Sequence, residues 1–158
     1  MQQPQVATDR STALTVTAWV KLRSFPNVHA AMATRQIGRG FRDHFFFGFE
    51  GNRLRVKSHT WNGSIVGGPP LSLERWFHAA FTHDEQGMTR LFLDGAEVAR
   101  QQGPHIDRGL VTSNLTIGAG HYSRYPQLVR QRLDGSIDEV RIYRRALPAA
   151  EIAALAGH

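Results

Sequence analysis

The stretch from Leu133 to Leu155, LDGSIDEVRIYRRALPAAEIAAL, contains the two patterns that decide how the chain ends. A glycine precedes the run from Ser136 to Tyr143, whose β-branched and apolar residues favour a β-strand. Pro148 then fixes φ at the start of a short run, Ala149 to Ala156, whose apolar residues fall on one face. We therefore expect a long final strand, followed by a helix that packs against the domain.

Two earlier segments indicate the same all-β organisation. The segment TVTAWVKL, Thr15 to Leu22, alternates apolar and polar residues and predicts a half-buried strand. The segment RWFHAAFTHDEQGMTRLFLDGAEVA, Arg75 to Ala99, predicts a hairpin at Asp94-Gly95, because a type I′ turn needs positive φ at both central residues. A second hairpin is expected around Glu50-Gly51-Asn52. The expected core includes Phe47, Phe81, Leu91, Leu93, Leu115, Val140 and Ile142.

The order and spacing of these three segments resemble the laminin-G-like, concanavalin-A-like lectin/glucanase family from about Leu14 to Leu155. The resemblance implies an all-β fold, an antiparallel two-sheet jelly-roll sandwich with a short C-terminal helix at 149–156. We expect residues 1–158 to form a single domain, since this length supports one core. Family members carry another strand upstream, which only Gln5 to Leu14 can supply here. An incomplete N-terminal strand is therefore an open alternative.

Composition excludes several classes of site. The chain has no cysteine, which excludes disulfides, thiolate metal sites and cysteine nucleophiles. No apolar run approaches the roughly 18–20 residues that a membrane span needs, so no membrane span is expected. The first residues, MQQPQVATDRST, lack a signal-peptide pattern. The compartment is thus unknown from composition, while the family resemblance implies a secreted or cell-surface protein.

The net charge of +6 comes almost entirely from arginine, since Lys21 and Lys57 are the only lysines. Arginine suits carboxylates, sulfates and phosphates because its planar fork donates hydrogen bonds in pairs. The arginines are dispersed from Arg10 to Arg145, a pattern that is also typical of a solvated surface. Charge alone makes nucleic acid a minor alternative. An acidic glycan remains a possible partner.

The sequence favours a protein without enzymatic activity. Glucanases of the family carry two or more carboxylates on one strand in the pattern Glu-x-Asp-x-x-Glu, which is absent here. Asp84-Glu85 and Asp138-Glu139 are adjacent pairs, and neighbours on a strand point to opposite faces. A glycoside hydrolase is therefore the lesser alternative.

Asp138 is the candidate metal ligand. It shares strand parity with Val140 and Ile142, so it is expected to lie at the edge of the core, where a carboxylate needs a partner or a cation. Related sandwiches hold a structural Ca²⁺, and the resemblance implies that Asp138 contributes to one, with Asp9 as a second carboxylate. The alternative is that Asp138 only accepts hydrogen bonds.

The candidate ligand site lies on two long loops that carry aromatic residues. The residues are Trp61, His121, Tyr122, Arg124 and Tyr125. Indole and phenol rings stack on the CH-rich faces of sugars, and arginine favours an acidic or sulfated sugar. Trp76 and His78 are interpreted as structural, and Trp19 and Phe92 as core residues.

These observations favour a non-catalytic carbohydrate-binding, lectin-like module with specificity for acidic glycans as one option. Its expected partner is a glycan or glycoprotein, with other domains of a longer chain as a further option. The alternative function is protein–protein adhesion or assembly, because the same fold serves both.

Overall fold

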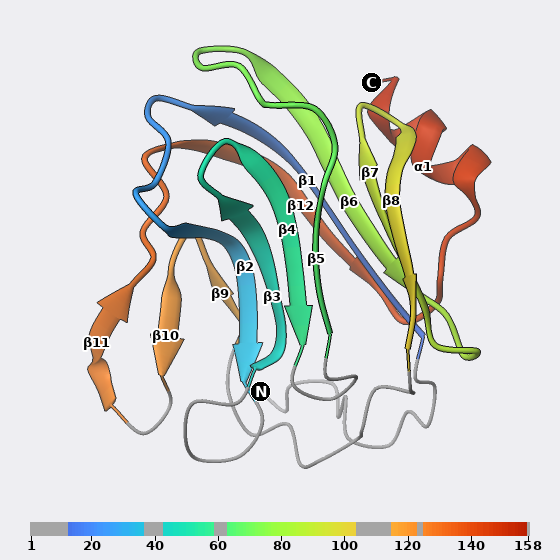
Figure 1. The fold of residues 1–158 in the computed structure, drawn as a ribbon, viewed down its shortest axis with the longest axis horizontal. Helices are drawn as coiled ribbons and strands as arrows, with labels where there is room; N and C mark the ends of the chain where they lie inside the picture. The colour runs from blue at the N-terminus through green and yellow to red at the C-terminus, as the bar shows by residue number, and fades with distance from the viewer. Residues whose placement is uncertain (1–12, 37–42, 59–62, 104–114, 123–124, 158) are drawn as a thin grey trace, which may run out of the picture.

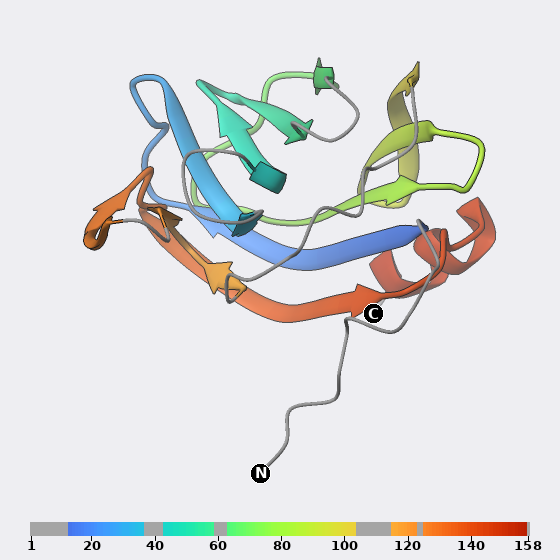
Figure 2. The same cartoon turned by 90° about the horizontal axis from the view of Figure 1, so that it is seen from below.

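The computed structural model describes residues 13–36, 43–58, 63–103, 115–122 and 125–157, which form two antiparallel sheets of five strands each. Figure 1 shows sheet B in front of sheet A, and Figure 2 shows sheet A curving beneath sheet B. Sheet A has the order β12 (Gly135–Tyr143), β1 (Leu14–Leu22), β6 (Trp76–His83), β7 (Met88–Leu93) and β8 (Ala96–Gln102). Sheet B has the order β5 (Gly63–Gly67), β4 (Arg53–Ser58), β3 (Asp43–Glu50), β2 (His29–Gln36) and β9 (Thr116–Ile117). The predicted all-β sandwich is confirmed.

Two further elements complete the fold. The strands β10 (Gly120–Tyr122) and β11 (Tyr125–Arg130) form a separate two-stranded sheet. The helix α1 (Ala149–Ala156) follows β12 and lies next to β7 and β8 (Figure 1). Strands β5, β10 and β11 fall in segments that the sequence predicted to be irregular. Their glycine and proline content suggests turns, whereas pairing with a neighbouring strand determines that they are extended.

Phenylalanine rings join the two sheets. The Phe81 ring of sheet A lies 5.6 Å from Phe45 and 5.0 Å from Phe47 of sheet B, measured between ring centroids. Phe47, Phe81 and Leu91 are completely buried, and the predicted residues Leu93, Leu115 and Val140 pack partly buried against them. Burial of such rings is the main favourable term in folding. The predicted core is therefore largely confirmed.

Ile142 is the exception, because its side chain is 42% exposed. It pairs with the buried Val16, so its strand position is that of a core residue. However, β12 forms the edge of sheet A, where a side chain has neighbours on one side only. The prediction that Ile142 is a core residue is wrong for this reason.

The helix α1 covers part of the outer face of sheet A. Ile152 of the helix and Leu147 before it are buried against Ala80 and Phe92. The Thr15 hydroxyl accepts a hydrogen bond from the Leu147 amide at 2.9 Å, which fixes the connection to the helix. Phe92 is thus buried as predicted, but beneath the helix instead of between the sheets.

The Asp94-Gly95 hairpin has the predicted backbone conformation. The φ angles are 49° at Asp94 and 84° at Gly95, as a type I′ turn requires. The Asp94 carboxylate also accepts a hydrogen bond from the His78 amide at 2.9 Å, which ties the turn to β6. The positive φ angles therefore explain why Asp94 and Gly95 form this turn, and the hydrogen bond to His78 is a second reason for the aspartate.

A β-bulge in β12 changes the direction of its side chains. Thr17 pairs with Arg141, whereas Trp19 pairs with Asp138, so β12 contains one residue more than β1 over this interval. The extra residue lies near Glu139, whose φ is 50°. Asp138 is consequently exposed beside Trp19 and does not follow the parity of Val140. The prediction that Asp138 faces the core edge is wrong.

Candidate functional site

The predicted loop site cannot be assembled from the described residues. Trp61 and Arg124 lie outside them, and of His121, Tyr122 and Tyr125 only the backbone is described. Tyr122 pairs with Tyr125 at the turn end of β10 and β11. In Figure 1, this turn lies at the same end of the molecule as the C-terminal end of β4 and the N-terminal end of β5. These two strands flank Trp61 in the sequence. The ligand site on these loops stays a prediction.

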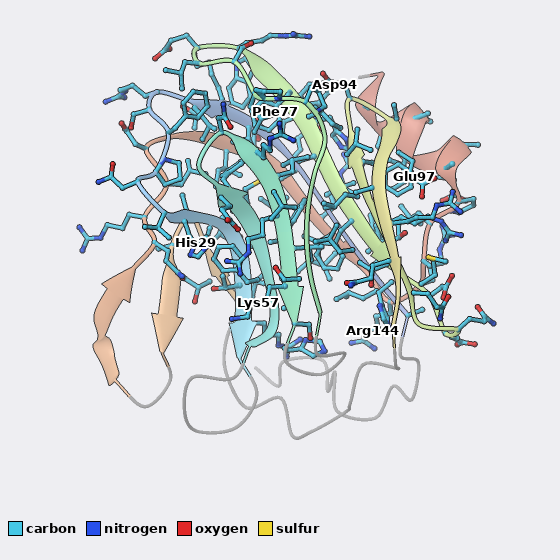
Figure 3. All side chains as sticks on the ribbon, in the orientation of Figure 1. His29, Lys57, Phe77, Asp94, Glu97 and Arg144 are labelled. Atoms are coloured by element: carbon cyan, nitrogen blue, oxygen red, sulfur yellow. The ribbon has the colours of Figure 1, made fainter. Side chains whose placement is uncertain are left out.

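The outer face of sheet B carries a row of cations on β4. Leu54, Val56 and Ser58 are buried, so Arg53, Arg55 and Lys57 point outward at spacings of about 7 Å. Strand pairing places Glu50 beside Arg53, and Phe46 and Ser64 beside Lys57. Figure 3 labels Lys57 and His29 over this sheet. We call this surface the basic face; it comprises His29, Phe46, Glu50, Arg53, Arg55, Lys57 and Ser64.

Arg55 is held in place by three neighbours on the basic face. Its Nε donates a hydrogen bond to Ser64 Oγ at 3.2 Å and lies 3.4 Å from Glu50 Oε2. Its guanidinium carbon lies 5.6 Å from the centroid of the Phe46 ring. Phe46 is only 2% exposed, and the Arg55 side chain is 13% exposed. A restrained guanidinium of this kind loses little entropy when it binds an anion.

His29 adds little positive charge to the basic face at neutral pH. Burial and the nearby Arg55 lower its pKa, although Glu50 opposes this shift. The His29 Nε2 atom lies 3.6 Å from Glu50 Oε2, and its ring meets Phe46 edge to face. The basic face therefore carries three permanent cations and one carboxylate, and this net positive charge favours anionic ligands.

The outer face of sheet A has a different composition. Trp19 pairs with Asp138 on one side and His78 on the other, and Lys21 pairs with Trp76. An open hollow of about 280 Å³ is lined by Trp19, Trp76, Asp138 and Glu139. We call these four residues the tryptophan face.

The tryptophan face corrects three sequence interpretations. Trp19 is not a core residue but lies on the outer face, and Trp76, which was expected to be structural, is 42% exposed there. Asp138 and Glu139 line the same hollow because the bulge breaks the strand alternation, so they do not point to opposite faces. Strand parity is the sequence signal that indicates the outward position of Trp19, because Trp19 alternates with the buried residues Ala18 and Val20.

His78 is buried, as its structural interpretation implied. It is 2% exposed, and its ring lies 5.2 Å from Trp19 in an edge-to-face arrangement. Its Nδ1 atom has no hydrogen-bond partner in the described part of the chain. Burial lowers its pKa, so the ring is neutral at pH 7.

The described residues alone do not form a calcium cage. They contain no group of three His, Cys, Asp or Glu side chains that could hold a metal ion. The Asp138 carboxylate accepts a hydrogen bond from the Glu139 amide at 2.8 Å, and Asp9 lies outside the described residues. Because Ca²⁺ takes six to eight oxygen ligands, a site at Asp138 needs donors such as Asp9. The calcium site stays a prediction.

Solved structures with the same architecture include proteins that act on or bind sugars. The module named CBM40 of a Ruminococcus gnavus IT-sialidase superposes with a TM-score of 0.77 at 16% identity, covering 92% of this chain and 83% of that one. A candidate carbohydrate-binding protein from Bacteroides ovatus superposes with a TM-score of 0.68 at 17% identity, and the match covers 96% of this chain and 42% of that one. A Trypanosoma rangeli sialidase superposes with a TM-score of 0.68 at 17% identity, and the match covers 91% of this chain and 22% of that one. At these identities the likeness concerns the fold.

The chain thus spans less than half of the Bacteroides protein and about a fifth of the Trypanosoma sialidase. A search of curated proteins finds no match. A laminin G family model, described as the concanavalin A-like lectin/glucanases superfamily, matches residues 1–153. Nearly the whole chain is matched, and the chain therefore belongs to this superfamily.

Proposed function

We propose that this protein is a non-catalytic carbohydrate-binding module that binds acidic glycans on the basic face of sheet B. The observation that carries the proposal is the position of Arg55, restrained by Ser64, Glu50 and Phe46 in the middle of an outward row of cations. A restrained guanidinium can donate paired hydrogen bonds to the carboxylate or sulfate of a sugar. Arg53 and Lys57, one strand repeat away on either side, extend the positive potential along the strand.

The proposed site continues toward the loops that the sequence singled out. In the sequence, Trp61 belongs to the connection between β4 and β5, and the other four residues belong to β10, β11 and the connection between them, namely His121, Tyr122, Arg124 and Tyr125. In the proposal, their rings stack on sugar units next to the acidic group, and Arg124 adds a further cation. The Ruminococcus module, determined with α2,3-sialyllactose, is a relative in fold whose ligand carries such an acidic sugar.

The alternatives have weaker support. An adhesion or assembly module is expected to expose one broad apolar patch. The large apolar side chains that are exposed in the described residues come instead from separate segments, namely Val28, Val66, Leu73, Trp76, Ile117 and Ile142. For a glycoside hydrolase, the candidate pair of catalytic carboxylates among the described residues is Asp138 and Glu139, which line one hollow. Both are exposed, however, and they are adjacent in the sequence. We propose that they act in binding.

We also propose that the protein works outside the cell, where its glycan partners are displayed. Among the residues that the structure describes, no helix combines the length and apolar character needed to cross a membrane.

The test is calorimetric titration with α2,3-sialyllactose and a heparin-derived hexasaccharide, with lactose as the neutral control. Arg55→Ala is expected to weaken binding of the acidic sugars about tenfold or more, since a charge-assisted hydrogen bond contributes roughly 1.5–3 kcal/mol. Added salt should weaken binding by the wild type and matter less for the variant.

Arg100→Ala is the matched control, because it removes the same charge from β8, where Arg100 pairs with Glu97 at 2.6 Å. It should leave binding of the acidic sugars unchanged. Equal losses in both variants would mean that net charge alone attracts the sugars. Failure of the wild type to bind either acidic sugar would overturn the proposed function.

A further inference from the structure

We propose that the tryptophan face of sheet A is a second carbohydrate site, which takes the ring of a neutral sugar. This site goes beyond the proposed function, because it lies on the opposite sheet and its lining has the opposite charge. Its parts are two indole rings, two carboxylates and an open hollow of about 280 Å³. This volume is near the lower end of small-ligand sites, about 300 Å³, and suits a single sugar ring, either free or as one unit of a longer chain.

The indole rings are positioned by strand alternation. Val16, Ala18 and Val20 of β1 point into the core, so Trp19 points outward. Trp76 begins β6 and pairs with Lys21, whose Nζ atom lies 5.7 Å from the centre of the Trp76 ring. This cation–π contact favours a fixed orientation of an indole that nevertheless stays 42% exposed.

Trp19 is supported from the side by His78, at 5.2 Å between ring centroids. The buried imidazole packs edge to face against the indole and restricts its movement on that side. Further along the same face, α1 covers Ala80 and Phe92. The tryptophan face is thus the part of this surface that the helix leaves open.

The β12 bulge brings the hydrogen-bonding groups to the indoles. Asp138 lies beside Trp19 in the strand register, and Glu139, with its φ of 50°, lines the same hollow. Bulges of this kind redirect side chains and are common near binding sites. Ionised carboxylates accept hydrogen bonds from pairs of sugar hydroxyls, while the indole faces stack on C–H groups.

The charges decide which sugars fit. Two carboxylates line the hollow, and of these Glu139 lies 4.0 Å from the Arg141 guanidinium. A sugar carboxylate or sulfate next to Asp138 would meet a like charge, which disfavours binding. A neutral pyranose offers hydroxyl donors and a C–H face without this repulsion. The basic face and the tryptophan face therefore select different sugars.

The test is titration with a panel of neutral hexasaccharides, namely cellohexaose, laminarihexaose and mannohexaose, monitored by tryptophan fluorescence and by calorimetry. The chain has three tryptophans, so Trp61→Phe leaves Trp19 and Trp76 as the only indole reporters. In this background, a neutral hexasaccharide is expected to shift the emission. Trp76→Ala should weaken binding about tenfold or more, and Asp138→Asn should weaken it less.

Ile142→Ala is the matched control, since Ile142 has the same 42% exposure and lies on the same sheet. It should leave neutral-sugar binding intact, and circular dichroism should show that Trp76→Ala stays folded. Arg55→Ala should leave neutral-sugar binding unchanged while it impairs binding of acidic sugars. This pair of variants separates failure of this inference from failure of the proposed function.

Two binding results, and one result on salt dependence, would overturn the inference. One is the absence of binding to every neutral hexasaccharide of the panel at millimolar concentration. The other is binding that Trp76→Ala does not weaken. Strong salt dependence of neutral-sugar binding would also contradict it, because no charged sugar group is involved.

Discussion

The outer faces of the two sheets use aromatic residues in opposite ways. On the basic face, Phe46 is 2% exposed and lies beneath the Arg55 guanidinium, so the cation is what a ligand meets. On the tryptophan face, Trp76 is 42% exposed, and two carboxylates line the hollow beside it. In one place the ring supports the charge, and in the other the ring is itself the contact surface.

This difference is the basis for our proposal that the two faces bind different sugars. Both faces derive from the same period-two alternation, in which inward residues form the common core and outward residues remain available. Because the two sheets share one core, a substitution that weakens the core should destabilise both faces together. Because the outward residues differ, we expect a substitution on one face to leave ligand binding by the other face unchanged.

The largest expected effect is the loss of stability caused by Phe81→Ala, which should affect both faces. Phe81→Ala removes the ring that contacts Phe45 and Phe47 across the sandwich. We expect a loss of about 3–5 kcal/mol in the free energy of unfolding, as for other large core truncations. Urea unfolding measures this loss. Binding of acidic and neutral sugars should fall in parallel on warming, whereas loss at one face alone would show that the sheets are not stabilised by a common core.

Acid should weaken the fold through histidines that burial keeps neutral. The pKa of His44 is lowered to about 4 by burial and by the nearby Arg35 and His83. Between pH 6.5 and about 4 the unfolded chain therefore binds more protons, so stability is complete above pH 6.5 and falls as the pH decreases. The expected loss is up to about 3 kcal/mol, and it should be measurable by urea unfolding as a function of pH.

His44→Gln should flatten this pH dependence. A smaller slope in the same direction should remain, because burial also lowers the pKa of His78 behind the tryptophan face and of His29 on the basic face. The acid loss therefore probes both sheets. An unchanged pH dependence in His44→Gln would show that His44 is not its main source.

The turn at Gly95 links the hairpin of sheet A to the helix. Gly95 has a φ of 84°, and a Cβ atom there would lie 3.1 Å from the Ala153 Cα atom of α1. Gly95→Val should therefore lower stability by more than about 1 kcal/mol. Gly51→Val is the control, because its φ of 57° is also positive but nothing lies within 4 Å of its Cβ position. Equal losses in urea unfolding would mean that the helix contact contributes nothing.

The sequence was informative where alternation is regular. Burial of Phe47, Phe81 and Leu91, the Asp94-Gly95 turn and the helix at 149–156 all follow from local patterns, and the structure confirms them. The alternation of Arg53, Arg55 and Lys57 was also visible. That Glu50 and Ser64 hold Arg55 depends on which strands pair, and a single sequence does not show such pairing.

The tryptophan face was missed for two physical reasons. The apolar type of Trp19 predicts a core residue, although its parity with Lys21 places it on the outer face of sheet A. Asp138 was placed by parity, although an extra residue near Glu139 shifts the register of β12. A bulge needs only one residue in an unusual conformation, and no apolar pattern reports it.

The smallest expected effect is that of calcium at Asp138 and Asp9. Bound Ca²⁺ should raise the melting temperature of the wild type in a concentration-dependent way, and it should not do so for Asp138→Asn. The shift should be small, because Asp138 is exposed and the described residues offer no group of three candidate ligand side chains. Thermal melting in calcium and in chelator measures it. Identical melting would mean that Asp138 acts only as a hydrogen-bond acceptor, so that no calcium ion offsets the carboxylates of the tryptophan face and its contrast with the basic face stands.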